Sequence, residues 1–98
     1  MYVKVHATPG GEIVAVCDAN LIGRVLSDRK RRLDLAMHSP FYVGKKVGAK
    51  EAARALKGAR NVNLVGKKAI FAAKKAGIDV SSAVEIGEVP HLQAYSIQ

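Results

Sequence analysis

The sequence is poor in the features that mark several protein classes. Its 98 residues hold a single cysteine, Cys17, and no tryptophan. One cysteine cannot form an internal disulfide, and with three scattered histidines it lacks the paired ligand spacing of a zinc site. No apolar run approaches the roughly 18–20 residues that span a bilayer, and the first residues lack the apolar stretch of a signal peptide. We therefore expect a cytoplasmic protein with no metal, no cofactor and no membrane partner.

Motifs of catalysis are also scarce. The sequence has no GxGxxG, no phosphate-binding Walker loop and no GxSxG. One hypothesis is a small enzyme acting on a nucleotide or RNA, in which Cys17, Asp18 and His91 converge as nucleophile, carboxylate and base. A cysteine that ends an apolar strand is more often simply buried. We therefore expect no catalytic residues, no enzyme activity and no small-molecule substrate.

Acidic residues are few, and the positive charge is concentrated. The formal net charge is +8. Residues 24–75 carry 15 basic side chains against three acidic ones, a charge of +12, whereas the two flanks together carry one basic against five acidic residues, a charge of −4. Crowded cations repel one another in a folded protein unless an anionic partner neutralises them. A polyanion such as RNA is the partner that this distribution favours, and an acidic protein or a merely solvated surface are the alternatives.

The length fits one domain covering residues 1–98. Alternation predicts a strand at 2–7, and a second strand is expected at 12–17, after turn residues that join the two as a hairpin. Asp18 to Asn20 could cap a short turn at 21–22. A basic loop and a third strand follow within 24–36, then an irregular segment or short strand at 38–46. Strands are expected again at 84–86 and 92–97. This order favours an α+β fold, a two-layer α/β sandwich with a mostly antiparallel sheet, an N-terminal hairpin and two helices.

The two helices are predicted at 49–59 and about 65–76. Apolar residues of the first follow the three-four spacing of one buried face, and Gly77 would end the second. Asn63 is a candidate N-cap of the second helix. At 100° per residue, Ala69, Ala72 and Ala73 of the second helix share one arc, and its lysines share the opposite arc.

The basic side chains form four groups that we expect to contact RNA phosphates, since arginine and lysine both bind phosphate. They are the run Arg29, Lys30, Arg31 and Arg32, the pair Lys45 and Lys46, the helical stripe Lys50, Arg54 and Lys57, and the cluster Lys67, Lys68, Lys74 and Lys75.

Phe71 is placed in the middle of the lysine arc of the second helix. It could stack on an unpaired base while the lysines contact the neighbouring phosphates. It could instead be an edge-of-core residue packed under Phe41 and Tyr42, with the lysine stems covering it. Only 5% of the residues are aromatic, so phosphate and shape recognition fits this composition better than stacking of several bases.

Several blocks together resemble one family of archaeal proteins of about a hundred residues, catalogued as domain of unknown function four-two-four. The blocks are Met1–His6, Val16–Asp18 followed by Leu21–Gly23, Asn63–Gly66, and Gly87–Gln93. The resemblance implies an archaeal source, a cytoplasmic single-domain protein and a two-layer α/β sandwich. It also suggests a link to the translation apparatus, as a component of the small ribosomal subunit.

The preferred hypothesis is therefore an RNA-binding protein of the archaeal translation machinery, ribosomal or ribosome-associated. Its partners would be ribosomal RNA and neighbouring ribosomal proteins. The alternatives are the small Cys/His enzyme described above and a protein-interaction module that docks a partner on a sheet edge or an alanine-rich helix.

Overall fold

The N-terminal segment forms the hairpin expected for residues 2–17. The computed structural model describes residues 1–97 of the chain. Strand β1 (Tyr2–Thr8) pairs antiparallel with strand β2 (Gly11–Cys17), and Thr8 lies opposite Gly11 at the turn. Gly11 has a φ of +116°, a conformation that only glycine adopts at low cost. The prediction of this hairpin is confirmed.

A second, smaller hairpin follows, and the sequence pattern predicted only half of it. After a 3₁₀ turn, η1 (Ala19–Leu21), strands β3 (Val25–Ser27) and β4 (Arg32–Asp34) form a separate two-stranded sheet. The expected strand is β4, and the basic run leads into it as a loop. Strand β3 was missed because three residues are too few to establish an alternation.

The segment 38–46, expected to be irregular or a short strand, contains one helical turn and a very short strand. The turn is α1 (Ser39–Tyr42), and the strand is β5 (Lys45–Lys46). Helix α2 (Ala49–Leu56) follows. It ends three residues before the predicted end, because Lys57 is extended and Gly58 has a φ of +76°.

The second long helix begins two residues later than predicted, because a strand precedes it. Strand β6 (Val62–Val65) passes through Gly66 into helix α3 (Lys67–Lys75), and Gly77 follows with a φ of +88°. Asn63 lies inside β6, so the prediction that it caps the helix is wrong. All four residues of β6 are buried, and a short apolar run without alternation cannot be told from the start of a helix.

The last two strands form a tight hairpin. Strand β7 (Val84–Ile86) is the strand predicted there, and strand β8 (Val89–Ala94) both starts and ends three residues earlier than predicted. Gly87 and Glu88 make the turn, and both have positive φ values. The shorter loop lets Val89 and Ile86 pair directly.

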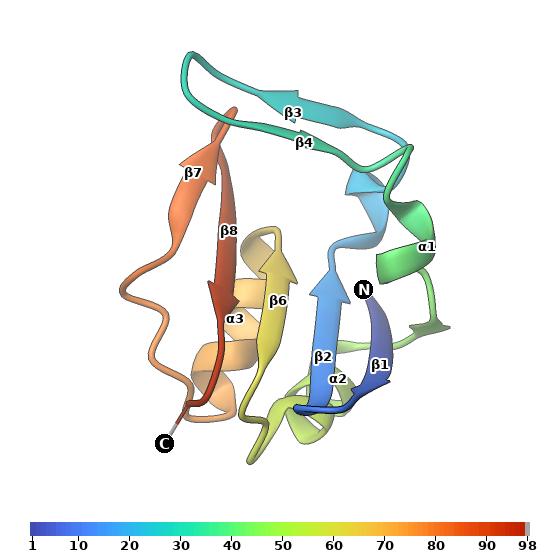
Figure 1. Ribbon diagram of the computed structural model, residues 1–98, viewed down its shortest axis with the longest axis vertical. Helices are drawn as coiled ribbons and strands as arrows, with labels where there is room; N and C mark the ends of the chain where they lie inside the picture. The colour runs from blue at the N-terminus through green and yellow to red at the C-terminus, as the bar shows by residue number, and fades with distance from the viewer. Residues whose placement is uncertain (98) are drawn as a thin grey trace.

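The six main strands form one sheet in the order β5-β1-β2-β6-β8-β7. The pair β2 and β6 is parallel, and every other pair in this sheet is antiparallel. In Figure 1 the β3–β4 hairpin lies across one end of the sheet. The α+β class with a mostly antiparallel sheet is thus confirmed. Among residues 1–97, no helix is long and apolar enough to cross a membrane.

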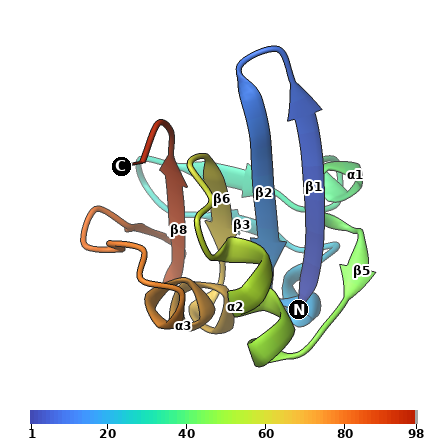
Figure 2. The ribbon, with the colours of Figure 1, turned by 90° about the horizontal axis from the view of Figure 1, so that it is seen from below.

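The two faces of the sheet pack against different elements. On one face, Val14, Val16, Leu64 and Leu92 of the sheet pack against α2 and α3, which lie side by side (Figure 2). On the other face, Cys17, Val65 and Ile86 pack against the β3–β4 hairpin and Tyr42 of α1. We call these the helix face and the hairpin face.

Candidate nucleic-acid interface

Helix α3 is oriented as the angular pattern predicts. Ala69, Ala72 and Ala73 are fully buried against the sheet, and Lys67, Lys68, Lys74 and Lys75 are exposed. Small side chains on the inner arc let the helix approach the sheet closely. The outer arc of α3 is therefore cationic.

The start of α3 is fixed by a residue 50 positions away. The buried Asp18 carboxylate accepts hydrogen bonds from the backbone N–H groups of Lys68 (3.0 Å) and Ala69 (2.8 Å). A carboxylate at this end of a helix also interacts favourably with the helix dipole. Asp18 makes no such side-chain bond to η1, so it caps α3 and not the short turn that follows it in sequence.

Helix α2 lies beside α3 and adds Lys50 and Arg54 to the same surface. Both are exposed on the outer side of the helix, while Ala52 and Leu56 are buried. The acidic residue of this helix, Glu51, is turned toward Lys45, whose Nζ lies 3.0 Å from Glu51 Oε2. Glu51 therefore partly neutralises the strand β5 pair and not the cations between the two helices.

Phe71 lies at the centre of this surface. Its side chain is 55% exposed, and the Lys75 Nζ lies 5.4 Å from the centre of its ring. Phe41 and Tyr42 pack on the hairpin face, on the other side of the sheet. The interpretation that places Phe71 beneath Phe41 and Tyr42 is therefore wrong, and the ring remains accessible.

Two adjoining hollows flank Phe71, and together we call them the Phe71 groove. Their volumes are about 520 and 410 Å³, and both are lined by Ala49 and Phe71. The cations that line the groove come from both helices: Lys50, Arg54, Lys67, Lys68 and Lys75. Within residues 1–97, no acidic side chain lines either hollow.

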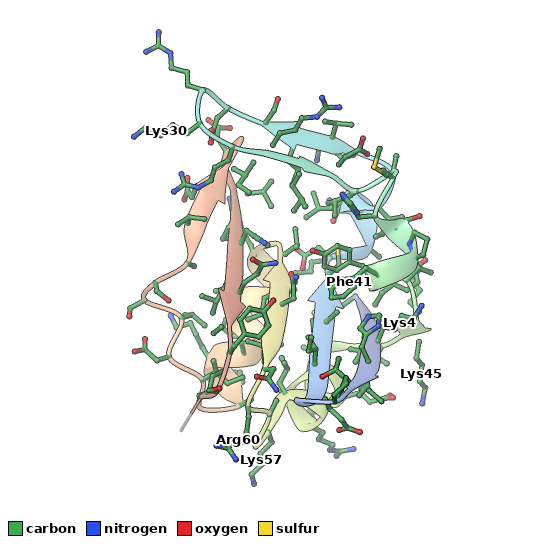
Figure 3. The ribbon with its side chains drawn as sticks, in the orientation of Figure 1. Lys4, Lys30, Phe41, Lys45, Lys57 and Arg60 are labelled. Carbon is green, nitrogen blue, oxygen red and sulfur yellow. The ribbon has the colours of Figure 1, made fainter. Side chains whose placement is uncertain are left out.

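The remaining predicted cations lie elsewhere on the molecule. Lys74 is exposed on α3 but outside the groove, and Lys57 lies beside Arg60 in a separate hollow near the β1–β2 turn. Figure 3 shows Lys30 on the hairpin loop, Lys45 at one side of the sheet, and Lys57 at the opposite end from the hairpin. Arg29, Arg31 and Arg32 share the hairpin with Lys30, and Lys46 shares β5 with Lys45. The fold therefore brings together five of the predicted cations and Phe71, and separates the others.

The constellation proposed for an enzyme does not assemble. Cys17 is fully buried, and burial together with the nearby Asp18 charge raises the pKa of its thiol to about 12. In the sheet register Val65 lies between Cys17 and His91. Two strand spacings separate them by roughly 9–10 Å at the backbone, and the Asp18 carboxylate is engaged by α3. The geometry gives no support to Cys17 as a nucleophile.

Sequence reasoning missed a group of polar residues on the hairpin face. Asn63 is 3% exposed, and its Oδ1 accepts a hydrogen bond from the Tyr42 hydroxyl at 3.0 Å. Gln93 lies directly opposite Asn63 in the register of β6 and β8. The available signal was an amide inside the apolar run Val62–Val65, which was assigned to a helix cap.

The fold of this chain is similar to that of a solved protein. A crystal structure of an uncharacterised conserved protein from Methanopyrus kandleri is similar to this chain, with a TM-score of 0.84 and 28% sequence identity. The match covers 98% of this chain and 90% of the other. No curated protein matches. The family model described as "Protein of unknown function (DUF424)" matches residues 6–97. Because that match spans nearly the whole chain, this protein belongs to the DUF424 family.

Proposed function

We propose that this protein binds single-stranded RNA through the Phe71 groove. The observation that carries the proposal is the accessible Phe71 ring enclosed by five cations from α2 and α3, with no acidic side chain lining the groove within residues 1–97. An unpaired base has two faces that can stack on an aromatic ring, and the phosphates on either side of it attract lysine and arginine.

The phosphate contacts would be made by side chains. A free helix N-terminus is itself an anion site, but the N–H groups of Lys68 and Ala69 are already bonded to Asp18. The cations around the groove are therefore the groups left to meet the RNA backbone. Their long stems allow the heads to follow phosphates without a change in the helices.

This proposal assumes the two-layer α/β sandwich predicted from the sequence, in which α2 and α3 form the layer that contacts the RNA. The translation link suggested by the family resemblance makes ribosomal RNA the first RNA to test. A cell lysate sedimented on a sucrose gradient would then carry the protein with ribosomal particles. After RNase treatment it should move to the top of the gradient.

Two neighbouring lysines allow a matched test of the groove. Lys75→Ala and Lys74→Ala remove the same charge from the same helix turn, but only Lys75 lines the groove. Each phosphate contact on single-stranded nucleic acid contributes about 0.7 to the slope of log K against log salt, so five contacts give a slope of about −3.5. Lys75→Ala should lower the magnitude of the slope by about 0.7, and Lys74→Ala should change it much less.

Phe71→Ala tests the stacking part of the proposal. Loss of one stacked base costs about 1–3 kcal/mol, which is roughly 5- to 150-fold in Kd. Phe71→Tyr should bind like the original protein because it keeps the ring. The measurement is fluorescence anisotropy of a labelled single-stranded RNA titrated at several salt concentrations. Equal losses for Lys74→Ala and Lys75→Ala, or unchanged affinity for Phe71→Ala, would contradict binding at the groove.

A further inference from the structure

The hairpin face contains a cleft that the proposed function does not use. It has a volume of about 350 Å³, at the small end of the range of ligand sites. The sheet strands β2, β6 and β8 form its floor, and β4 and α1 form its walls. Figure 3 looks onto this face, with Phe41 below the hairpin. Helices α2 and α3 lie behind the sheet in that view, so the cleft and the Phe71 groove are on opposite sides of the molecule.

Two carboxamides lie side by side on the floor of the cleft. Asn63 and Gln93 are direct cross-strand partners, and both line it. The Tyr42 hydroxyl donates to Asn63 Oδ1 and so fixes the orientation of that amide, with its nitrogen as the remaining donor. Gln93 is exposed and can present both its oxygen and its nitrogen. The pair thus offers an adjacent set of donors and an acceptor on a rigid sheet.

A third polar side chain, His91, lies on the same face of β8 as Gln93 but does not line the cleft. His91 is two residues before Gln93, and alternation along the strand sends both side chains to the hairpin face. His91 is 9% exposed, and its buried Nδ1 has no hydrogen-bond partner within residues 1–97. Burial lowers the pKa of His91, so the ring is neutral at pH 7. An unpaired buried nitrogen costs free energy unless a further partner completes it.

The walls of the cleft are aromatic. Phe41 is stacked on His6 with ring centres 4.2 Å apart, and it meets Tyr42 edge-on at 5.0 Å. Tyr95 also lines the cleft and is 56% exposed. His38 also lines the cleft, and no Lys, Arg, Asp or Glu of residues 1–97 does. Aromatic walls with carboxamides and without formal charge suit a flat, uncharged group whose edge carries both donors and acceptors.

We propose that the cleft on the hairpin face binds one nucleobase, with Gln93 and Asn63 on its hydrogen-bonding edge and the aromatic side chains against its ring. Carboxamides pair with two edge atoms of adenine at once, which makes adenine the first base to test. The base could belong to an unpaired nucleotide of the RNA bound at the groove or to a free nucleotide. The first of these sources rests on the proposed function. Both sources present the same chemistry to the cleft.

The test is an NMR titration of the full chain with AMP, adenosine and ribose 5-phosphate. The side-chain NH₂ signals of Asn63 and Gln93 and the backbone signals of 91–94 should shift with AMP and adenosine. They should not shift with ribose 5-phosphate, which lacks the base. Gln93→Leu should weaken AMP binding at least tenfold, whereas Asn20→Ala, which removes an exposed carboxamide outside the cleft, should leave it unchanged.

A titration with a short single-stranded oligoadenylate, in the original protein and in Lys75→Ala, distinguishes the sources. Shifts at Asn63 and Gln93 that depend on Lys75 assign the base to RNA held at the groove. If AMP shifts the NMR signals of Asn63 and Gln93 but the protein binds no RNA, the cleft is a site for free nucleotides. That result overturns the proposed function and not the cleft. If the protein binds RNA but neither AMP nor oligoadenylate shifts the signals of Asn63 and Gln93, the proposed nucleobase site is wrong. The proposed function is then unaffected.

Discussion

At the scale of single residues, buried polar groups define how this fold is held together. Asp18 is 6% exposed, and its two carboxylate oxygens are bonded to the first turn of α3. Gly66 lies directly against it, and a Cβ built on Gly66 would collide with the Asp18 carboxylate. Gly66 also has a φ of +109°. Position 66 therefore needs a glycine for two reasons: its backbone conformation, and the space that the Asp18 carboxylate fills.

Two glycine substitutions separate these reasons. Gly23 has a φ of +90° with open space where its Cβ would be, so Gly23→Ala should cost only the backbone term, about 1–2 kcal/mol. Gly66→Ala should cost more than Gly23→Ala, because the φ of +109° and ψ of 158° at Gly66 lie in a region that is essentially restricted to glycine. Displacing Asp18 from the helix adds about 1–3 kcal/mol. Urea denaturation measures both free energies of unfolding. Equal losses in the two variants would mean that the Asp18 contact contributes nothing.

The pH dependence of stability is a second prediction at this scale. Burial raises the pKa of Cys17 from 9.0 to about 12, and burial also raises the pKa of Tyr42 from 10.0 to about 12. Between these values the unfolded chain releases protons that the folded chain keeps. The stability is therefore complete below about pH 9 and is lost as the pH rises from 9 to 12, by up to about 1.4 kcal/mol per pH unit for each group.

Urea denaturation at several pH values between 8 and 11 checks this prediction. Cys17→Ala should flatten the decline above pH 9, whatever its effect on stability at pH 7. In the native protein the Cys17 thiol should also react with a disulfide reagent only as fast as the protein unfolds. Rapid reaction of the folded protein would contradict the burial of this thiol and reopen the enzyme hypothesis.

At the scale of elements, the loop of the β3–β4 hairpin is attached to the β7–β8 turn. At its loop, Asp28 accepts hydrogen bonds from the N–H groups of Lys30 (2.9 Å) and Arg31 (3.0 Å), and from Gly87 in the β7–β8 turn (3.3 Å). These bonds lower the pKa of Asp28, and the bonds from Lys30 and Arg31 have the largest effect. One carboxylate thus shapes the cationic loop and ties it to a neighbouring hairpin.

Asp28→Ala should release that loop. We expect faster hydrogen exchange at the amides of Lys30, Arg31 and Gly87, since each loses its acceptor. The amides of Ala36 and Met37, which Asp34 holds in the same kind of turn, serve as an internal control and should be unchanged. RNA binding at the Phe71 groove should also be unchanged, because the hairpin packs on the other face. Unaltered exchange at Gly87 would show that the hairpin is held without this bond.

Element prediction from the sequence worked where a pattern was long enough. Strand β1 and the buried alanine arc of α3 have regular periods over seven or more residues, whereas β2 was predicted as an apolar segment and ends in four consecutive buried residues. Strands β3 and β6 have three and four residues, and β6 is buried on both faces, so neither has a period to read. The cap of α3 was misassigned to Asn63 because its acceptor, Asp18, is distant in sequence.

At the scale of the whole molecule, the net charge of +8 is spread over a small body. The principal extents are 33, 28 and 26 Å. At 0.01 M salt the Debye length is about 30 Å, so every cation interacts with every other, and at 0.15 M it is about 8 Å. Within residues 1–97 there are two ion pairs, the exposed Lys45 with Glu51 and the exposed Arg32 with the half-buried Asp34. Repulsion should therefore dominate the long-range electrostatics.

Salt should consequently stabilise the free protein. Raising NaCl from 0.01 to 0.15 M should raise Tm, measured by differential scanning fluorimetry. A variant with Arg29, Lys30 and Arg31 each changed to Gln should show a smaller rise, since these are exposed cations without a partner among the ion pairs of the described residues. A Tm that falls with salt would mean that attractive pairs outweigh the repulsion.

The sequence by itself determined the α+β class, the N-terminal hairpin, the inner and outer arcs of α3 and the excess of positive charge, because each is encoded by composition or by a local period. Only the tertiary structure decided which cations share a surface, that Phe71 is accessible, and that Asn63 lies beside Gln93. These facts depend on strand order and on contacts between residues up to about 50 positions apart. A local period in the sequence indicates on which side of its helix or strand a side chain lies. The residues that this side chain contacts depend on how the elements pack together.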